Sequence, residues 1–419
     1  MRRFLVLAAF VAGCARPAPP AEFTLKVAVV GSLAPLAHDT QATASTFAAD
    51  LLFEAVFQPD GNGIRSRVLA RWERRGDRLR AYVADGLVFS DGSPVTVDDV
   101  ARSIATAGLK VRRDGLWLDI GPGADGLPVD AVLLMAVVYK PSPRGDVGTG
   151  PFRLVSQDEH RLVVERAVPV RGRIGRVEII SFPSIRETFA RALKGEVNGV
   201  LSLDDRQVEL MDGVPHLRII RARGPHALAI TFNARRLGRG LRRQIADSLP
   251  VEEITDIALT KGCGPPSGRW QATLLPPGAP LGIMVTALDA SIDRAGLATR
   301  RSLGPRGGDV VRLDPGQAVR GRAEHDLIVD YVIVWPPVLG ALYWKSNGPW
   351  NWTGYSNSAY DAAVDAGDRE RAEGELKKDP PVLELCRRER IAAVDARLKN
   401  ATLGAWGTFD TLPEWKVSP

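Results

Sequence analysis

The segment from Asp85 to Ile104 (DGLVFSDGSPVTVDDVARSI) constrains the local fold more than any other part of this chain. It begins with a short apolar run, Leu87–Phe89, that favours a strand. The stretch Asp91–Pro94 then predicts a tight turn, because glycine accepts positive φ and proline fixes its own φ. Thr96 is a good N-cap and is followed by two acidic residues, so a helix is expected to start there.

Taken whole, this segment resembles the signature of the family 5 extracellular solute-binding proteins, the receptors of dipeptide, oligopeptide and nickel ABC importers. The family pattern is roughly Phe-x-Asp-Gly-x-Pro-Leu-Thr-Ala-x-Asp-Val, and this chain matches it at Phe89, Asp91, Gly92, Pro94, Thr96, Asp99 and Val100. Further similar stretches are Val68–Glu73, Gly148–Phe152 (GTGPF), Ala227–Asn233 (ALAITFN) and Trp350–Asp361. The resemblance covers nearly all of the chain beyond the N-terminal segment, with gaps at Val100–Gly148, where the family carries a longer subdomain, and at Leu281–Arg322, which is weakly patterned.

The resemblance implies an α/β fold with two lobes, of the class II periplasmic-binding-protein type, with a central cleft and hinge crossings. A chain of 419 residues is also too long for one ordinary core, so two or more lobes are expected from length alone. The expected boundaries are a signal peptide at 1–14, a tether at 15–22, lobe I at 23–225 with a trimmed subdomain at about 55–147, lobe II at 226–381, and a return to lobe I at 382–419.

The Gly148–Phe152 motif could also be interpreted as a phosphate-binding loop. That interpretation is not favoured, because no Lys-Ser/Thr pair follows at the spacing that phosphate binding needs. We instead expect its two glycines to adopt unusual backbone angles and Pro151 to stiffen the entry into a strand.

The N-terminus has the layout of an export signal. Two arginines precede the apolar run Phe4–Phe10, which is too short to span a bilayer permanently. The stretch Val11–Cys14 resembles a bacterial lipobox, which implies that Cys14 is the acylated first residue of the mature protein. An ordinary secretory signal with an incidental cysteine is the alternative. The proline-rich residues that follow predict an extended tether, so we expect an exported, periplasmic or extracytoplasmic protein anchored by lipid.

Two other cysteines, Cys263 and Cys386, are present. An exported protein can oxidise them to a disulfide, but two partly buried free thiols remain the alternative, because sequence does not show that the residues are close. Two cysteines cannot form a structural zinc site, and the five histidines are scattered. We therefore expect neither a metal site nor a cofactor.

The sequence favours binding over catalysis. It contains no Gly-x-Ser-x-Gly elbow and no His-Glu-x-x-His motif. The adjacent acids Asp98-Asp99 and Asp204-Asp205 do not face each other on a helix, so they are poor candidates for a catalytic pair. The net charge of +6 is modest for this length and predicts a solvated basic surface rather than nucleic-acid binding.

The resemblance also implies where a solute would bind. Residues expected to line the cleft are Thr43, Ser45, Phe47, Leu201, Ser202 and Trp335, with Trp350 and Trp352 as candidates for stacking or cation–π contacts. Oligopeptide receptors of the family carry an Asp that pairs with the α-ammonium of the peptide. The matching position here is Trp335, which has no charge to offer, so a free peptide N-terminus is not the favoured ligand. Asp330 lies nearby and is also a candidate ligand contact.

The sequence thus predicts a substrate-binding lipoprotein of an ABC importer, not an enzyme. It would capture a small or peptide-like solute and deliver it to a membrane permease and its ATPase. The first alternative is a diverged solute sensor or chaperone-type binder that is not coupled to transport. The second is an exported hydrolase whose catalytic residues are dispersed along the chain.

Overall fold

A computed structural model describes residues 23–418, with gaps at 32, 34, 39–42, 61–62, 125–126, 144, 204, 260–274, 289, 335–338, 405 and 408. The expected signal peptide and tether, together with Cys263 and Trp335, lie outside the described residues. Within the described part of the chain, no helix is both long and apolar enough to cross a membrane.

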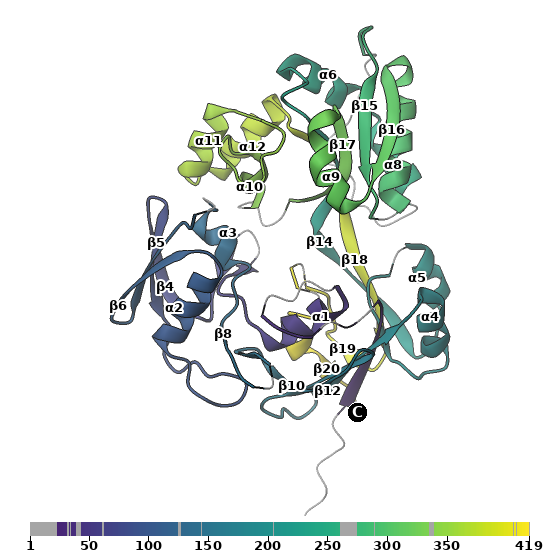
Figure 1. Cartoon of the computed structure of the whole chain (residues 1–419). Helices are drawn as coiled ribbons and strands as arrows, with labels where there is room; N and C mark the ends of the chain where they lie inside the picture. The colour runs from purple at the N-terminus through teal and green to yellow at the C-terminus, as the bar shows by residue number, and fades with distance from the viewer. Residues whose placement is uncertain are drawn as a thin grey trace, which may run out of the picture.

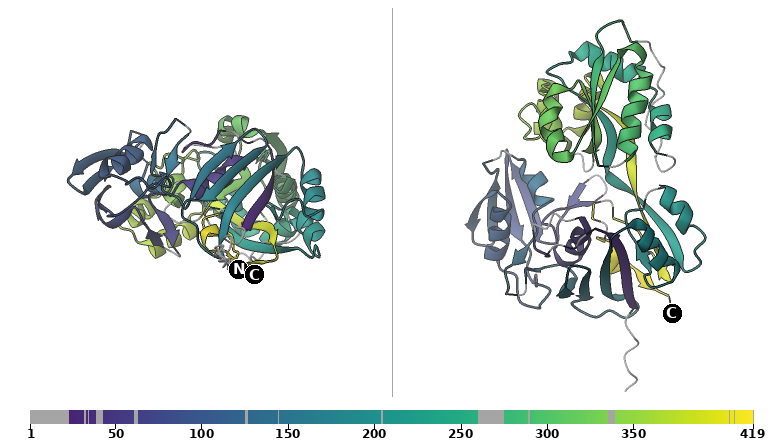
Figure 2. Two further views of the ribbon diagram at one scale, coloured as in Figure 1. Left: turned by 90° about the horizontal axis from the view of Figure 1, so that it is seen from below. Right: turned by 45° about the vertical axis from the view of Figure 1, so that its right-hand side comes forward.

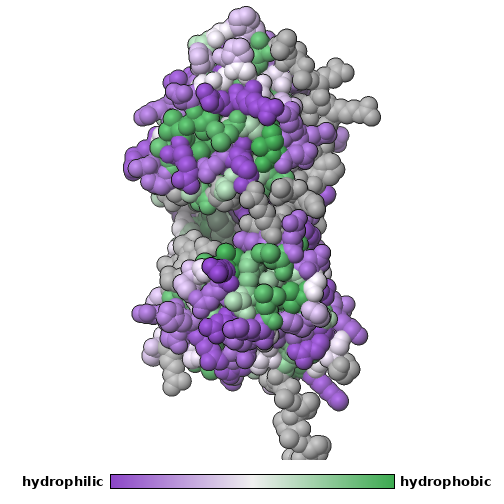
Figure 3. Space-filling view, turned by 90° about the vertical axis from the view of Figure 1, so that its right-hand side faces the viewer, coloured by the Kyte–Doolittle hydropathy of each residue, from purple (hydrophilic) through white to green (hydrophobic). Residues whose placement is uncertain are grey.

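Two lobes stand one above the other, and two long strands pass from one lobe to the other (Figure 1). These strands are β14 (Leu217–Phe232) and β18 (Val382–Asp395), and they pair in antiparallel fashion. They lie within a ten-stranded sheet of order β10-β11-β12-β1-β13-β18-β14-β17-β15-β16. The turned views show the same division, and the space-filling view shows a waist between the two masses (Figures 2 and 3). One sheet therefore runs through both lobes.

Lobe I, the lower body in Figure 1, contains the first half of this sheet and the helices beside it. Its strands in the ten-stranded sheet are β1 (Phe23–Val30), β10 (Phe152–Gln157), β11 (Arg161–Arg166), β12 (Ile174–Phe182) and β13 (Gly199–Val200). Its helices outside the subdomain are α1 (Thr43–Leu52), α4 (Ile185–Leu193), α5 (Asp205–Met211) and a 3₁₀ turn at Leu412–Glu414. Short strand pairs are β2 (Gln58–Asp60) with β3 (Gly63–Arg65), β8 (Tyr139–Lys140) with β9 (Val147–Gly148), and β19 (Leu398–Lys399) with β20 (Lys416–Val417).

The alternation of side chains along β1 explains the layers of lobe I. Leu25, Val27 and Val29 are buried on one face, where they share a core with α1 and the C-terminal segment. Ala28 points to the other face and packs in a second core with α4 and α5. Successive residues of a strand face opposite sides, so a strand with buried apolar side chains on both faces needs cover on both faces.

A four-stranded antiparallel sheet forms the subdomain of lobe I. Its order is β4-β5-β7-β6, with bounds β4 (Leu69–Arg75), β5 (Arg78–Val83), β6 (Lys110–Asp114) and β7 (Trp117–Gly121). Two helices, α2 (Val97–Thr106) and α3 (Val129–Leu133), share its apolar core.

The Asp85–Ile104 segment confirms one expectation and corrects another. Thr96 caps α2 as predicted, and its side chain forms a reciprocal capping box with Asp99. The predicted strand at Leu87–Phe89 is wrong, because only an isolated bridge from Val88 to Pro94 forms there. The turn places the short apolar run against Ser93–Val95, the residues that follow the turn. Phe89 is buried in the subdomain core instead of pairing in a sheet.

The glycines of the Gly148–Phe152 motif serve close packing and do not need unusual backbone angles. A Cβ at Gly148 would lie 2.1 Å from the carbonyl oxygen of Leu52, and one at Gly150 would lie 2.4 Å from that of Leu51. Neither glycine has a positive φ, which corrects the expectation from sequence. The backbone N–H of Gly150 donates to Leu52 O at 2.9 Å, so the motif lies directly against the end of α1.

Lobe II, the upper body in Figure 1, contains the other end of the sheet. Its strands are β15 (Leu281–Thr286), β16 (Gly307–Leu313) and β17 (Leu327–Ile333). Its helices are α6 (Arg239–Ser248), α7 (Val251–Ala258), α8 (Ala290–Ser302), α9 (Pro315–Gly321), α10 (Gly340–Trp344), α11 (Ser358–Asp365) and α12 (Arg369–Lys378), with 3₁₀ turns at Gly304–Arg306 and Arg322–Glu324. The weakly patterned segment 281–322 thus forms a β15-α8-β16 unit with parallel strands, followed by α9.

The pairing of β14 with β18 is interrupted between the lobes. Three residues of β14, Gly224–His226, lie opposite the single residue Arg388, between the pairs made by Arg223 and Ala227. A bulge of this kind bends a strand and increases its local twist. The Nε of Arg387 donates to Gly224 O at 3.1 Å and holds the bulge together.

His226 lies in this bulge and is partly buried. Burial, together with the nearby cations Arg390 and Arg388, lowers its pKa from 6.5 to about 4. Because charging a buried imidazole beside two guanidinium groups is unfavourable, His226 is neutral in the folded protein near pH 7.

We predict that Gly150→Ala lowers the free energy of unfolding by about 1–3 kcal/mol, because the added methyl overlaps the backbone of α1. Gly240→Ala is the matched control, since Gly240 lies in α6 with open space where its Cβ would be. It should be neutral or slightly stabilising. Urea denaturation measures both, and equal stability of the two variants would contradict the close-packing explanation.

We also predict that His226 contributes a pH-dependent part of the stability. Between pH 6.5 and about 4 the unfolded chain binds a proton at this residue and the folded chain does not. Its stabilising contribution is therefore complete above pH 6.5 and is lost as the pH falls towards 4, by up to about 3 kcal/mol.

The measurement is urea denaturation at pH 7, 6 and 5 for the wild type and His226→Gln. The variant should lose less stability than the wild type over this range. His160→Gln is the control, because His160 is exposed. If the wild type and His226→Gln show the same pH dependence, His226 does not make this contribution.

Candidate functional site

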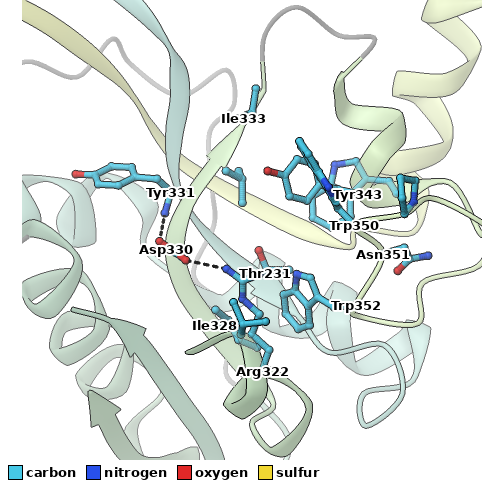
Figure 4. A pocket seen from close by; sticks show the side chains of 14 residues that line it. Thr231, Arg322, Ile328, Asp330, Tyr331, Ile333, Tyr343, Trp350, Asn351 and Trp352 are labelled. Atoms are coloured by element: carbon cyan, nitrogen blue, oxygen red, sulfur yellow. Dashed lines mark hydrogen bonds and ion pairs between the residues drawn. The ribbon is translucent and has the colours of Figure 1, made fainter. Parts of the chain in front are cut away.

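A cavity of about 470 Å³ lies in lobe II, between β17 and the segment that follows α10 (Figure 4). Its lining residues come from β14, the end of α9, β17, α10 and the following loop: Thr231, Val319, Arg322, Ile328, Asp330, Tyr331, Val332, Ile333, Tyr343, Trp344, Pro349, Trp350, Asn351 and Trp352. The volume is within the range of small-molecule sites. The cavity brings together Asp330, Trp350 and Trp352, three of the residues that the sequence predicted as ligand contacts.

Asp330 is a buried carboxylate that accepts three hydrogen bonds. It is 6% exposed and sits in the middle of β17. Its Oδ2 accepts from the Thr286 hydroxyl at 2.8 Å and from Arg322 Nη2 at 3.3 Å, and its Oδ1 accepts from the backbone N–H of Tyr331 at 2.7 Å. These donors offset the cost of burying a charge, so Asp330 is held in one orientation.

Arg322 is the cation of the cavity. It follows α9 and opens the 3₁₀ turn that leads into β17, and its guanidinium carbon lies 5.4 Å from the ring centre of Trp352. Its side chain is 26% exposed, yet its Nε is buried and has no partner among the described residues. Stacking on an indole face favours a guanidinium and restricts the orientation of its plane. Figure 4 shows Arg322 between Trp352 and Asp330.

Aromatic side chains form another wall. The rings of Tyr343 and Trp350 meet edge to face, with centres 5.2 Å apart. Burial raises the pKa of the Tyr343 hydroxyl, so it is neutral and protonated near pH 7.

The loop that carries the two tryptophans is held by Asn351. Its Nδ2 donates to Lys345 O at 3.0 Å, and its Oδ1 accepts from the Thr353 hydroxyl at 2.9 Å and from the backbone N–H of Tyr355 at 3.2 Å. Because one amide satisfies backbone groups on both sides of the loop, Trp350 and Trp352 are presented on a fixed backbone.

The cavity wall also touches lobe I. Leu339 and Leu342 are almost fully buried in the apolar core that otherwise belongs to the lobe I subdomain. Tyr343 and Trp350, which line the cavity, pack against the same core. A solute bound in the cavity would therefore contact side chains that lie at the junction of the two lobes.

The predicted contacts on lobe I do not reach this cavity. Ser45 is fully buried in α1, Leu201 is 4% exposed, and Phe47 packs against Phe409 with ring centres 6.4 Å apart. Ser202 is exposed and has a φ of 58°, in the left-handed region. Thr43 is described only as the first residue of α1.

Two other expectations concern metals and cysteines. Among the described residues, no group of three or more His, Cys, Asp or Glu side chains is placed to hold a metal ion. Cys386 is disulfide-bonded, and the other two cysteines, Cys14 and Cys263, lie outside the described residues. The pairing of Cys263 with Cys386 therefore stays a prediction.

Sequence reasoning missed Arg322 and Tyr343. Arg322 ends the weakly patterned segment, so no motif marked it, and the aromatic Tyr343 follows a stretch that matched nothing quoted from the family. The available signal was the aromatic density between 343 and 352, where a Tyr and three Trp occur within ten residues. Such a density is unusual at a solvated surface and is typical of a binding wall.

Comparisons with known proteins define the class of fold. The chain has the mixed α/β fold of periplasmic substrate-binding proteins over nearly its whole length, which confirms the predicted fold class. No protein-family model matches the sequence, and no curated protein sequence matches it.

Particular solved structures with this fold are described as substrate-binding, oligopeptide-binding and nickel ABC transporter proteins. The ABC transporter substrate-binding protein CtaP of Listeria monocytogenes has a TM-score of 0.74 and 15% identity, covering 95% of this chain and 100% of that one. The oligopeptide-binding protein AppA of Bacillus subtilis, solved with a nonapeptide, has a TM-score of 0.66 and 13% identity, covering 95% and 99%. A nickel ABC transporter protein of Bacillus halodurans has a TM-score of 0.71 and 14% identity, covering 94% and 100%.

Proposed function

We propose that this protein is the substrate-binding component of an ABC importer, and that it captures a small or peptide-like solute and delivers it to a membrane permease. The observation that carries the proposal is the cavity beside β17, whose walls at Tyr343 and Trp350 also pack against lobe I. The fold supports it, because solved proteins with this fold are described as substrate-binding, oligopeptide-binding and nickel ABC transporter proteins.

The proposed cycle uses the two crossing strands as the hinge. The bulge at Gly224–His226 interrupts their pairing between the lobes, so a small change in backbone angles there would change the angle between the lobes. A solute favours the closed arrangement only by binding it more tightly than the open one. Contacts that it makes with Tyr343 and Trp350 would provide this preference, because these side chains meet lobe I only when the lobes are together.

The closed form would present one combined surface to a permease. We propose no catalytic step, because Asp330, the one acidic side chain among the described lining residues, already accepts three hydrogen bonds. We further propose that Cys14 carries a lipid anchor, which would hold the receptor close to its transporter on the outer side of the membrane.

The proposal predicts that a true ligand stabilises the folded protein. We would screen amino acids, short peptides, sugars and metal chelates by thermal shift. A ligand at 100 times its Kd adds about 2.7 kcal/mol to the free energy of unfolding, which raises the Tm measurably.

Two variants test whether the thermal shift arises from binding in the cavity. Trp350→Leu should abolish the shift caused by a hit, whereas Trp72→Leu should retain it, because Trp72 is a partly exposed residue of β4 that does not line the cavity. The proposal fails if no compound of these classes shifts the wild type, or if Trp350→Leu responds as the wild type does.

The lipid anchor predicts a simple fractionation result. The full chain expressed in a bacterium should sediment with membranes, and Cys14→Ser should appear in the soluble exported fraction. Cys263→Ser is the control for the loss of a cysteine and should remain with the membranes. A Cys14→Ser protein that stays in the membrane fraction would exclude the anchor.

A further inference from the structure

Arg322 has more hydrogen-bonding capacity than its surroundings use. A guanidinium has five N–H donors, and among the described residues only the Nη2 bond to Asp330 engages one of them. The buried Nε has no partner there, although the side chain as a whole remains 26% exposed on the cavity wall. Buried donors on a charged group are normally satisfied, so this guanidinium is short of acceptors, and its exposed part can bind one that the protein does not itself supply.

The ion pair with Asp330 does not explain why an arginine is placed in this cavity. The carboxylate already accepts from Thr286 at 2.8 Å and from the Tyr331 backbone at 2.7 Å, both shorter than the 3.3 Å contact from Arg322. Meanwhile Trp352 covers one face of the guanidinium. That contact leaves the edges of the plane, where the N–H groups point, as the parts that can bind a solute.

Cationic side chains also lie near the hinge side of the cavity. Arg388 lies over the ring of Tyr331, which lines the cavity, with its guanidinium carbon 5.0 Å from the ring centre. His226 pairs in register with Ile333, another lining residue, and both Arg388 and Arg390 help to depress the pKa of His226. Among the described lining residues, Asp330 is the one acidic side chain. Among the same residues Arg322 is the one basic side chain, so it is the cation that a negative group would meet.

We propose that the solute carries a carboxylate that bonds the free edge of Arg322, attached to a planar apolar body that lies against Trp350 and Tyr343. This inference rests on the proposed function and specifies the chemical class of its ligand. A planar body suits the edge-to-face pair formed by those two rings, and the carboxylate matches the fork of the guanidinium.

Two other head groups fit less well. An ammonium would need the buried Asp330, whose oxygens already accept three hydrogen bonds and which is 6% exposed. A doubly charged phosphate on Arg322 would lie close to the Asp330 carboxylate, because that carboxylate is itself only 3.3 Å from Arg322 Nη2. Like charges repel in a partly buried site, and a doubly charged phosphate meets more of this repulsion than a singly charged carboxylate does.

The test uses three matched probes: 3-phenylpropionate, 3-phenylpropanamide and phenethylamine. Their affinities for the full protein are measured by isothermal titration calorimetry at pH 7. We expect the carboxylate to bind at least ten times more tightly than the amide, and the amine to bind most weakly. Arg322→Gln should remove the preference for the carboxylate, and Arg322→Lys should retain part of it.

Arg320→Gln is the matched control, because Arg320 is an exposed residue of α9 that does not line the cavity. It should keep the wild-type preference. The Tm of each variant without probe shows whether it is folded, and Arg322→Lys preserves the test if the glutamine variant is not.

The outcomes distinguish failure of this inference from failure of the proposed importer function. Equal binding of carboxylate and amide, or tighter binding of the amine, overturns the inference while the importer proposal stands. So does a hit from the solute screen that lacks a carboxylate, or one that binds Arg322→Gln unchanged. If neither the probes nor any solute in the screen binds the wild type, the proposed function fails and the inference fails with it.

Discussion

The antiparallel pairing of β14 with β18 is the constraint on which the rest of this structure depends. Each of the two strands passes through both lobes. In the ten-stranded sheet, the remaining strands of lobe I lie on the β18 side of the pair, and those of lobe II lie on the β14 side. The bulge opposite Arg388 interrupts this pairing, and a second register shift follows between Leu228 and Ala229. At Gly224 a Cβ would lie 3.0 Å from Arg388 O. Irregularities of this kind bend a strand locally, which is why we propose the hinge at this part of the crossing.

The cavity is a consequence of this arrangement. Strand β17 pairs with the lobe II half of β14, which fixes Asp330 opposite Ala229 and directs its side chain towards Thr286 and Arg322. The segment after β17 then leads into α10, whose Leu342 is buried in the core of the opposite lobe. The aromatic wall is thus connected through a few residues both to the proposed hinge and to the lobe junction, and this connection is how the proposed function would link occupancy of the cavity to closure of the lobes.

Features that depend only on neighbouring residues could be predicted from the sequence, whereas features that depend on tertiary contacts could not. The capping box at Thr96 was predictable because a cap depends on residues within one helical turn. The close packing that requires glycine at 148 and 150 could not be predicted. These glycines contact the end of α1, nearly a hundred residues earlier in the chain. Asp330, Trp350 and Trp352 were named from a resemblance, whereas Arg322 joins them only through tertiary structure. The buried positions of Ser45 and Leu201 likewise depend on packing that no pattern of spacing reveals.

The central claim is that two rigid lobes close on a solute about the β14 and β18 crossing. Its most direct test is the distance between spin labels at Leu116 in the lobe I subdomain and Glu370 in α12, both exposed, measured by pulsed electron paramagnetic resonance. Without solute, the account predicts a broad distribution with a longer mean distance. With the solute that stabilises the protein most, it predicts a narrower and shorter one. The same distribution with and without a stabilising solute would contradict the account.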